Sequence, residues 1–205
     1  KPDELIVIED SSTDKTLEIV KDYRKTLKRL KVFHVETRNI SKNRNIAIKK
    51  SNGQIIICVD AGCVLDKNYI KEITLPFKDK NIEFVGGFSN LVSRTLFDKC
   101  FAAFVVKKQA PKDYIPKGHA MAFRKKVWEK VRGFPEHLAR GAEDTYFGKK
   151  AIRLGIRPFL IKKAIIYWEN RSNLGEIYRQ FKSYGYWDAK AFSVIELPTN
   201  SKLVI

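Results

Sequence analysis

The sequence lacks several features that would place it in a specialised class of protein. Its three cysteines, Cys58, Cys63 and Cys100, include no Cys-x-x-Cys pair of the kind found in redox and zinc motifs. No apolar run approaches the roughly 18 residues that a membrane-spanning helix needs, and no signal peptide is recognisable. We therefore expect reduced, buried thiols and a cytoplasmic protein.

Negative charge is also scarce. The chain has 40 lysines and arginines against 23 acids, which gives a formal net charge of +17. Such a charge attracts polyanions, but lysines spread along a whole chain are equally typical of an ordinary basic surface. Because no nucleic-acid-binding motif is present, nucleic acid is not an expected partner. An anionic membrane surface is an expected partner, and the protein would then be peripheral at the cytoplasmic face of the membrane.

What the sequence does contain is an alternation of short apolar runs with segments of helical period. In the first half, strands are predicted at residues 5–8, 32–35, 55–59 and 84–87, and helices at 17–30, 45–50 and 69–77. Nearly uninterrupted apolar strands between helices are typical of a parallel sheet that is buried on both faces. The first half therefore predicts an α/β fold.

The second half is less regular but continues without a low-complexity linker. Strands are predicted at residues 119–123, 156–161 and 164–168, and helices at 96–106, 125–131, 143–154 and 174–192. The aromatic residues of the last helix are expected to be core residues. Residues 1–205 are therefore predicted to form a single domain.

Carboxylates stand where two of the predicted strands end. Glu9 and Asp10 follow the first strand, and Asp60 follows the third. Ligands of open α/β sheets bind outside the carboxyl ends of the strands. Taken alone, Asp10 would serve equally well as a cap for the next helix, and Asp60 as a lone acid at a solvated edge.

Three stretches together resemble the motifs of family 2 glycosyltransferases, in the family's order and over nearly the whole chain. They are ELIVIEDSSTDKT, RNISKNRNIAIKKSNGQIIICVDAGCVLD and KGHAMAFRKKVWEKVRGFPEHLARGAEDTYFGKKAIRLG. The resemblance implies the GT-A fold of nucleotide-diphospho-sugar transferases, with a mostly parallel sheet flanked by helices. Residues from about 1 to 95 would form the nucleotide-sugar-binding half, and residues from about 96 to 205 the acceptor-side half. The family's first strand and helix are missing, as expected of a fragment of a longer protein.

The resemblance implies roles on the donor side. Asp10 matches the acid that hydrogen-bonds the nucleotide base, and Glu9 replaces the aspartate that usually precedes it. Arg44 matches an arginine near the donor phosphates, which guanidinium groups suit, although an isolated arginine is usually an exposed surface residue. Asp60 matches the first acid of the Asp-x-Asp motif, which holds Mg²⁺ or Mn²⁺ at the donor diphosphate.

The metal motif is incomplete, because Gly62 stands in place of its second acid. Glu169 falls where relatives often carry a histidine that completes the metal shell. Since Mg²⁺ commonly uses only one or two protein carboxylates, a weakly held divalent metal (Mg or Mn) bound by Asp60 and Glu169 is the expected cofactor.

On the acceptor side, Glu143 and Asp144 match the family's acidic pair, in which the aspartate is the general base of inverting members. Repulsion from Glu143 would raise the pKa of such a base. By position alone, the two acids are better explained as residues that favour a helix N-terminus, and only the resemblance favours a catalytic role.

The expected function is therefore an inverting glycosyltransferase of glycan or cell-envelope biosynthesis. It would move a sugar from a UDP- or GDP-sugar donor to a hydroxyl or lipid-phosphate acceptor, so the expected partners are this donor and a glycan or lipid-linked acceptor. Two alternatives stay open. One is a degenerate, non-catalytic GT-A domain, because Glu9 and Gly62 depart from the motifs. The other is a basic module that binds nucleic acid or an anionic membrane.

Overall fold

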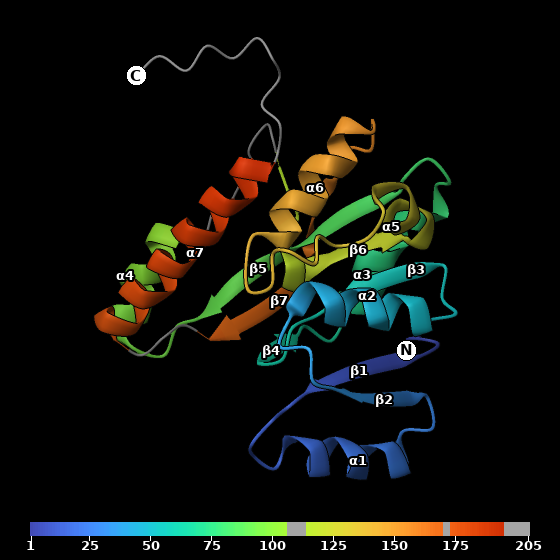
Figure 1. The fold of residues 1–205 in the computed structure, drawn as a ribbon, viewed down its shortest axis with the longest axis horizontal. Coiled ribbons are helices and arrows are strands. Elements are labelled where there is room, and N and C mark those ends of the chain that lie inside the picture. The colour runs from blue at the N-terminus through green and yellow to red at the C-terminus, as the bar shows by residue number, and fades with distance from the viewer. Residues whose placement is uncertain (106–113, 170–172, 195–205) are drawn as a thin grey trace.

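The structure is a computed structural model that describes residues 1–105, 114–169 and 173–194 (Figure 1). The strands are β1 (Leu5–Asp10), β2 (Leu30–Val35), β3 (Ile55–Cys58), β4 (Cys63–Leu65), β5 (Phe84–Val92), β6 (Met121–Arg124) and β7 (Phe159–Glu169). The α-helices are α1 (Thr16–Thr26), α2 (Ile40–Lys50), α3 (Tyr69–Thr74), α4 (Leu96–Val105), α5 (Lys125–Val131), α6 (Glu143–Arg153) and α7 (Leu174–Val194). Two 3₁₀ helices are η1 (Leu75–Lys78) and η2 (Gly118–Ala120).

The strands form a parallel pair, β1–β2, and a five-stranded sheet in the order β3-β6-β5-β7-β4. Within the larger sheet only β5 and β7 run parallel, whereas β3–β6, β5–β6 and β4–β7 are antiparallel. The predicted α/β class is confirmed, but the prediction of a mostly parallel sheet is wrong. An apolar run indicates only that a strand is buried on both faces of its sheet. A mixed sheet covered by helices on both faces produces the same sequence pattern as a parallel one.

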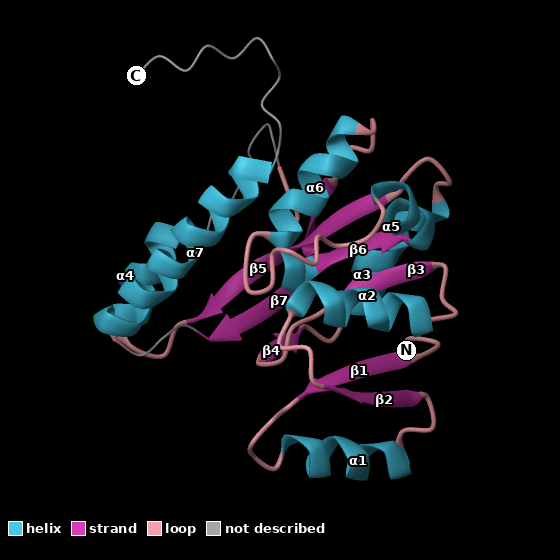
Figure 2. Ribbon diagram, in the orientation of Figure 1, coloured by secondary structure: helices cyan, strands magenta, loops and turns pink. Residues whose placement is uncertain are grey.

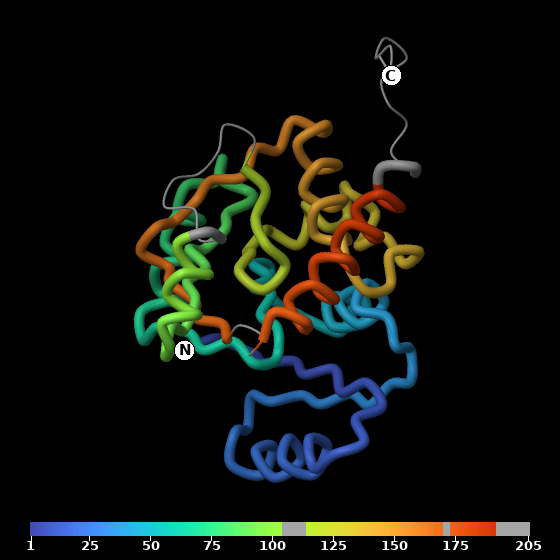
Figure 3. The backbone as a smooth tube through the Cα atoms, turned by 90° about the vertical axis from the view of Figure 1, so that its left-hand side faces the viewer, coloured from blue at the N-terminus to red at the C-terminus, as the bar shows by residue number. Residues whose placement is uncertain are grey.

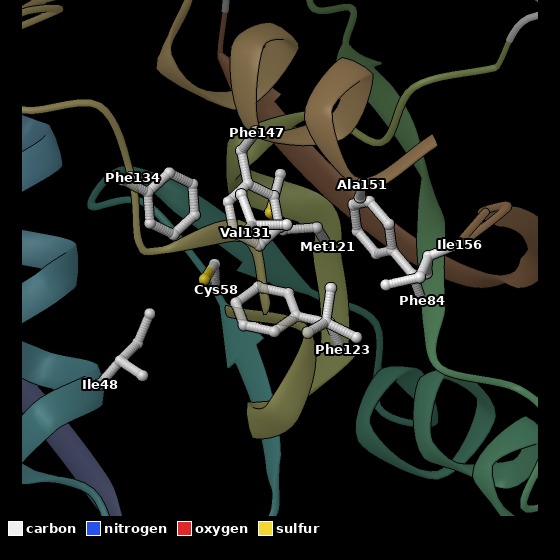
Figure 4. Close-up of a cluster of buried hydrophobic side chains, with 11 residues drawn as sticks. Ile48, Cys58, Phe84, Met121, Phe123, Val131, Phe134, Phe147, Ala151 and Ile156 are labelled. Atoms are coloured by element: carbon white, nitrogen blue, oxygen red, sulfur yellow. The ribbon is translucent and has the colours of Figure 1, made fainter. Parts of the chain in front are cut away.

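Helices cover both faces of the five-stranded sheet (Figure 2). Because side chains alternate along a strand, Phe84, Met121 and Phe123 point to the face under α2, α5 and α6. Their neighbours Val85 and Ala122 point to the opposite face, where α3 packs. The first face holds the aromatic core drawn in Figure 4, and Figure 2 shows the resulting three layers.

The unit formed by β1, β2 and α1 projects from one side of this sheet (Figure 1, Figure 3). No residue of α1 is buried, and the side chains of Ile19, Tyr23 and Leu27 are about half exposed. The predicted helix over residues 17–30 is too long, because α1 ends at Thr26 and Leu30 is a buried residue of β2. This unit therefore adds little to the core.

Three further details differ from the expectations. The three-residue strand β4 was not predicted, because it is too short to show a period. The two strands predicted at residues 156–161 and 164–168 are one strand, β7, in which a register shift opposite Gly87 and Phe88 accommodates extra residues. Cys58 is buried as expected, whereas Cys100 is exposed. Within the part of the chain that the structure describes, no helix has both the length and the apolar character to cross a membrane.

Two glycines give opposite predictions for the same substitution. A Cβ at Gly87 would lie 2.8 Å from the Ala164 carbonyl oxygen and 2.9 Å from the Tyr69 ring, whereas a Cβ at Gly185 in α7 meets nothing within 4 Å. We expect Gly87→Ala to lower the free energy of unfolding by about 1–3 kcal/mol and Gly185→Ala to raise it by about 0.5–1 kcal/mol. Urea denaturation of both variants measures this. Equal effects of the two substitutions would contradict the close packing of β5 against β7.

Candidate functional site

The candidate site is organised by three consecutive residues of α2. Asn39 caps this helix, its side chain accepting a hydrogen bond from the Lys42 N–H at 3.0 Å. Successive residues of a helix point about 100° apart, so Asn43, Arg44 and Asn45 reach three different segments. The Asn43 amide donates to Asp10, Arg44 contacts two carboxylates, and Asn45 bonds with the loop that follows α5. Helix α2 therefore joins segments that are far apart in the sequence.

The Arg44 guanidinium bridges two of the predicted acids. Its Nη2 donates to Asp60 Oδ1 at 2.7 Å and its Nη1 to Glu143 Oε1 at 2.5 Å. Arg44 is only 9% exposed, and its guanidinium carbon lies 5.5 Å from the centre of the Phe134 ring. Burial alone would lower the pKa of Arg44, but the carboxylates of Asp60 and Glu143 outweigh burial and raise it. The interpretation of an isolated Arg44 as an exposed residue is therefore wrong.

Glu143 and Asp144 open α6, directly after Ala142, which has a left-handed φ of 60°. Glu143 is buried, and Asp144 is half-buried. Asp144 Oδ2 accepts the Gly118 N–H at 2.7 Å, and Asp144 Oδ1 accepts the Thr145 N–H at 2.7 Å. Burial and the nearby Asp144 raise the pKa of Glu143, although Arg44 opposes both effects. The pKa of Glu143 is therefore raised even though its carboxylate is paired with Arg44.

Gly118 is a site residue that the sequence analysis did not single out. A Cβ at this position would lie 2.6 Å and 2.8 Å from the two terminal nitrogens of Arg44. The same residue donates its N–H to Asp144, so it packs between Arg44 and the acceptor-side acid. The available signal was a glycine at the start of a predicted strand, which often marks a close approach of the backbone to another group.

A histidine and a tryptophan line the same region. Ser89 Oγ lies 2.8 Å from His119 Nε2, and the imidazole ring centre is 6.4 Å from that of Trp168. The Lys117 ammonium lies 5.9 Å from the Trp168 ring centre. Burial lowers the pKa of His119 although Asp60 acts in the opposite direction. An imidazole whose pKa is lowered and an aromatic ring therefore lie close to each other in this region.

Glu9 and Asp10 are neighbours in β1 and therefore point to opposite faces of the strand. The buried Glu9 accepts the Ser12 N–H at 2.6 Å and lies 2.5 Å from His34 Nδ1. Asp10 instead accepts the N–H groups of Thr37 and Arg38 at 2.9 and 3.0 Å, and so it does not cap α1. The two acids cannot both contact one ligand on the same face.

Asp10 keeps some capacity to accept a hydrogen bond. Its Oδ2 accepts from the Asn43 amide at 2.8 Å and lies 3.3 Å from the Thr37 hydroxyl. The same hydroxyl lies only 2.6 Å from Asn43 Oδ1, and one hydroxyl has one proton to give. A lone pair of Asp10 Oδ2 is therefore available to a further donor.

Strained backbone flanks the predicted acids. Non-glycine residues with left-handed φ include Ser11 and Arg38, which lie in the two loops at the carboxyl ends of β1 and β2, and Ala142 before Glu143. Such conformations cost about 1–3 kcal/mol each and persist where the surroundings impose them. The backbone next to Asp10 and Glu143 is therefore held in place by its surroundings.

The two predicted metal ligands, Asp60 and Glu169, have different partners. The Asp60 side chain is 40% exposed and paired with Arg44, whereas the Glu169 carboxylate pairs with Arg94 at 2.5 Å. Among the described residues, no group of three or more His, Cys, Asp or Glu side chains is arranged to hold a metal ion. Both predicted metal ligands are therefore already paired with arginines, Asp60 with Arg44 and Glu169 with Arg94.

A cavity of about 630 Å³ lies beside Asn45 and Phe134. Its lining includes Trp128, Arg132, His137 and Tyr146, but none of the predicted site residues. We therefore locate the candidate site by the convergence of charged groups around Arg44, and not by this cavity.

Comparison with known proteins gives a consistent result. The sequence profile described as "Glycosyl transferase family 2" matches residues 1–131. The O-antigen chain rhamnosyltransferase RfbN of Salmonella typhimurium is 25% identical over 92% of this chain and 64% of its own length. The uncharacterized glycosyltransferase EpsJ of Bacillus subtilis is 27% identical over 85% of this chain and 55% of its own length. The chain thus spans less than two thirds of both relatives.

Solved structures establish the fold. The mannosyltransferase PcManGT of Pyrobaculum calidifontis, in complex with GDP-Man and Mn²⁺, superposes with a TM-score of 0.71 at 19% identity, over 95% of this chain and 56% of that one. Residues 1–349 of S. aureus TarS with UDP superpose with a TM-score of 0.66 at 23% identity, over 97% of this chain and 59% of that one. The predicted GT-A fold is confirmed.

The Arg44 bridge predicts a large difference between two arginines. In Arg44→Ala the buried Glu143 and the half-exposed Asp60 lose their counter-charge, and we expect the free energy of unfolding to fall by about 3–5 kcal/mol. Arg94→Ala is the matched control, because its ion pair with Glu169 is exposed on both sides and should contribute about 0–1 kcal/mol. Chemical denaturation compares the two. Similar losses would mean that the Arg44 bridge is not structural.

The raised pKa of Glu143 predicts a pH dependence of stability. Between the ordinary value near 4.5 and its own pKa, the folded protein binds more protons at Glu143 than the unfolded chain does. Stability from this group is therefore lost as pH rises through that window, by at most about 1.4 kcal/mol per pH unit. The difference in unfolding free energy between wild type and Glu143→Gln, measured by urea denaturation from pH 4 upward, isolates this contribution. A difference that is independent of pH would contradict it.

Proposed function

This chain belongs to glycosyl transferase family 2, and we propose that it is an inverting glycosyltransferase that uses a UDP- or GDP-sugar donor. The acceptor would be a hydroxyl or a lipid phosphate on a growing glycan. One observation carries this proposal: Arg44 holds Asp60, which follows a strand, together with Glu143 of the acidic pair that opens α6. The carboxylate proposed for the donor side and one carboxylate of the pair proposed for the acceptor side are thereby bonded to the same guanidinium.

On the donor side, we propose that Asp10 and Asp60 contact the nucleotide diphosphate. The available lone pair of Asp10 Oδ2 suits the imide N–H of uracil or the ring N–H of guanine. Asp60 follows β3 and is partly exposed, so a diphosphate can approach it. Glu9 faces away from Asp10, and we assign it to holding the Ser11–Ser12 turn through Ser12 and His34.

Arg44 acts in this proposal as a positioning residue. Both of its terminal nitrogens are engaged by carboxylates, and the guanidinium occupies the space that a side chain at position 118 would need. It would therefore orient Asp60 and Glu143 and reduce their mutual repulsion. The earlier expectation of a direct phosphate contact remains a prediction, which would require Arg44 to exchange one of these partners.

Asp144 is the proposed general base. Its carboxylate is more exposed than that of Glu143, and the Gly118 N–H fixes its Oδ2. It would take the proton of the acceptor hydroxyl as that oxygen attacks the anomeric carbon from the face opposite the leaving group. The bond from the anomeric carbon to the diphosphate breaks in the same step, the nucleoside diphosphate leaves, and the configuration inverts.

A divalent metal, when bound, would neutralise charge on the departing diphosphate. Asp60 would hold it, because this carboxylate is partly exposed and stands at the proposed diphosphate position. Glu169 could contribute only by exchanging its partner Arg94. Mn²⁺ in the solved structure of PcManGT belongs to that protein, and metal use by this chain is part of the proposal.

A non-catalytic GT-A domain is the second candidate. It is favoured by the lack of a three-ligand metal group among the described residues and by Gly62 in place of the second acid. Such a domain would bind a nucleotide without transferring its sugar.

Calorimetric titration of UDP and GDP, with and without Mn²⁺, tests the proposal on wild type, Asp60→Asn and Asp144→Asn. We expect wild type to bind one of the nucleotides with help from Mn²⁺, and Asp60→Asn to bind it at least about tenfold more weakly, which corresponds to 1.4 kcal/mol. Asp144→Asn should bind like wild type but hydrolyse or transfer the corresponding nucleotide sugar about 10²–10⁴-fold more slowly, because only the base is lost.

Asp22→Asn is the control for loss of one negative charge, because this side chain is 70% exposed on α1. It should leave nucleotide binding and turnover unchanged. Nucleotide binding without any turnover in wild type would favour the non-catalytic domain. No binding of either nucleotide would refute the donor site as proposed.

A further inference from the structure

The cavity of about 630 Å³ beside Asn45 and Phe134 takes no part in the reaction proposed above. It lies where α2, α5, α6 and the loop between α5 and α6 meet, on the face of the sheet that these three helices cover (Figure 2). Its volume is within the range of about 300–1,000 Å³ that is typical of ligand sites in proteins. The side chains that line it decide which ligand fits.

Each of the three helices turns one of its sides to the cavity. Each contributes a pair of lining residues four positions apart: Asn45 and Lys49, Trp128 and Arg132, Tyr146 and Lys150. The first pair belongs to α2, the second to α5 and its C-terminal cap, and the third to α6. Residues at this spacing are neighbours on the helix surface. The lining is therefore built from one side of each helix.

Aromatic rings form part of the wall. The His137 ring packs edge-to-face on Tyr146, with ring centres 5.7 Å apart, and Trp128 lines the same cavity. The Lys150 ammonium lies 6.0 Å from the centre of the Tyr146 ring. The face of an aromatic ring is a broad apolar surface with a negative potential. Such a face suits the weakly positive C–H groups on the face of a sugar ring.

The buried Asn45 amide holds this wall in place. Its oxygen accepts the Trp128 Nε1–H at 2.9 Å and the Phe134 N–H at 2.8 Å. Its nitrogen donates to the Phe134 carbonyl at 3.0 Å and to Glu136 Oε1 at 3.1 Å. These four bonds use the full hydrogen-bonding capacity of the amide. The indole and the Glu136 carboxylate are therefore positioned before any ligand binds.

The lining carries charges of both signs, which are nearly balanced. It contains three cations and two acids: Lys49, Arg132, Lys150, Glu129 and Glu136. Within the part of the chain that the structure describes, the side chains of Lys49, Glu129 and Arg132 make no hydrogen bond or ion pair. Asn45 occupies only one oxygen of Glu136. Donors and acceptors are therefore both available to a ligand in this cavity.

A neutral ligand with several hydroxyl groups uses such a lining best. Each hydroxyl can donate to a carboxylate and accept from an ammonium or guanidinium group. An anionic ligand would be attracted by the cations but repelled by Glu129 and Glu136, and a cationic ligand would meet the reverse. A neutral sugar has hydroxyls at its edge and C–H groups on its faces, so it matches both the charged groups and the aromatic rings. Sugars are also the substrates of the family to which the chain belongs.

The cavity adjoins the candidate site. The Arg44 guanidinium carbon lies 5.5 Å from the centre of the Phe134 ring, and Phe134 also lines the cavity. In α6, Glu143, Tyr146 and Lys150 follow one another at spacings of three and four residues, so they lie along one side of the helix. At 1.5 Å per residue, Lys150 is about 10 Å further along this helix than Glu143. The cavity and the candidate site thus share α6 and Phe134.

We propose that this cavity is a glycan subsite, which binds one neutral sugar unit of the acceptor chain other than the unit that reacts. The binding of a sugar here follows from the lining of the cavity alone. Its role in catalysis rests on the proposed function: a chain anchored in the cavity would present a further hydroxyl to Asp144 at the start of α6.

The tryptophans of the chain provide a direct test. Of the three, Trp128 lines the cavity, whereas Trp168 lies in the region of the candidate site and Trp187 on α7. Protein labelled with fluorotryptophan gives one fluorine NMR resonance for each, and Trp128→Phe assigns that of Trp128. The probes are the methyl glycosides of glucose, galactose, mannose and N-acetylglucosamine, without nucleotide. We expect at least one of them to shift the Trp128 resonance in a saturable way.

The double variant Lys49→Ala, Glu129→Ala removes one donor and one acceptor from the lining and leaves the net charge unchanged. It should bind the glycoside at least about tenfold more weakly, because hydrogen bonds to two charged groups are lost. Glu18→Ala, Lys21→Ala is the matched control, since it removes the same residue types from α1, where both side chains are exposed. It should bind the glycoside like wild type. Thermal unfolding followed by circular dichroism verifies that both variants are folded.

Inorganic phosphate is the competing probe, and we expect it to bind more weakly than the glycoside. Three results would overturn the proposal: no shift of the Trp128 resonance by any of the four glycosides, equal weakening in both double variants, or tighter binding of phosphate, which would assign the cavity to an anion. The titration contains no nucleotide, so its failure leaves the donor site intact. Failure of the UDP and GDP titrations likewise leaves this test intact.

Discussion

The ion pairs of Arg44 are the interaction on which the rest of the site depends. A buried guanidinium must have counter-charges, and here Asp60 and Glu143 supply them from segments that follow β3 and open α6. Gly118 leaves the space that the guanidinium fills, and its N–H holds Asp144. Asp60 and Glu143 are therefore held together by one buried cation.

Helix α2, which carries Arg44, also makes polar contacts with two other parts of the chain. Asn43 connects it to Asp10 and the loops of the β1–β2 unit, which otherwise projects from the sheet. Asn45 accepts the Phe134 N–H at 2.8 Å, and Ser41 Oγ donates to the Leu138 carbonyl at 2.8 Å. The loop that leads to α6 is thus fixed by the same helix that carries Arg44. Polar side chains therefore make many of the contacts by which α2 is joined to the rest of the structure.

The α/β class, the order of most elements and the acids at the ends of β1 and β3 could be predicted from the sequence, because the period of apolar residues and the position of a strand end are local properties. The strand directions and the burial of Arg44 could not, because they depend on contacts between distant residues. Arg44 and Glu143 are 99 residues apart. No local sequence pattern predicts this ion pair, because a charged side chain can be buried only where residues distant in the sequence supply its counter-charges.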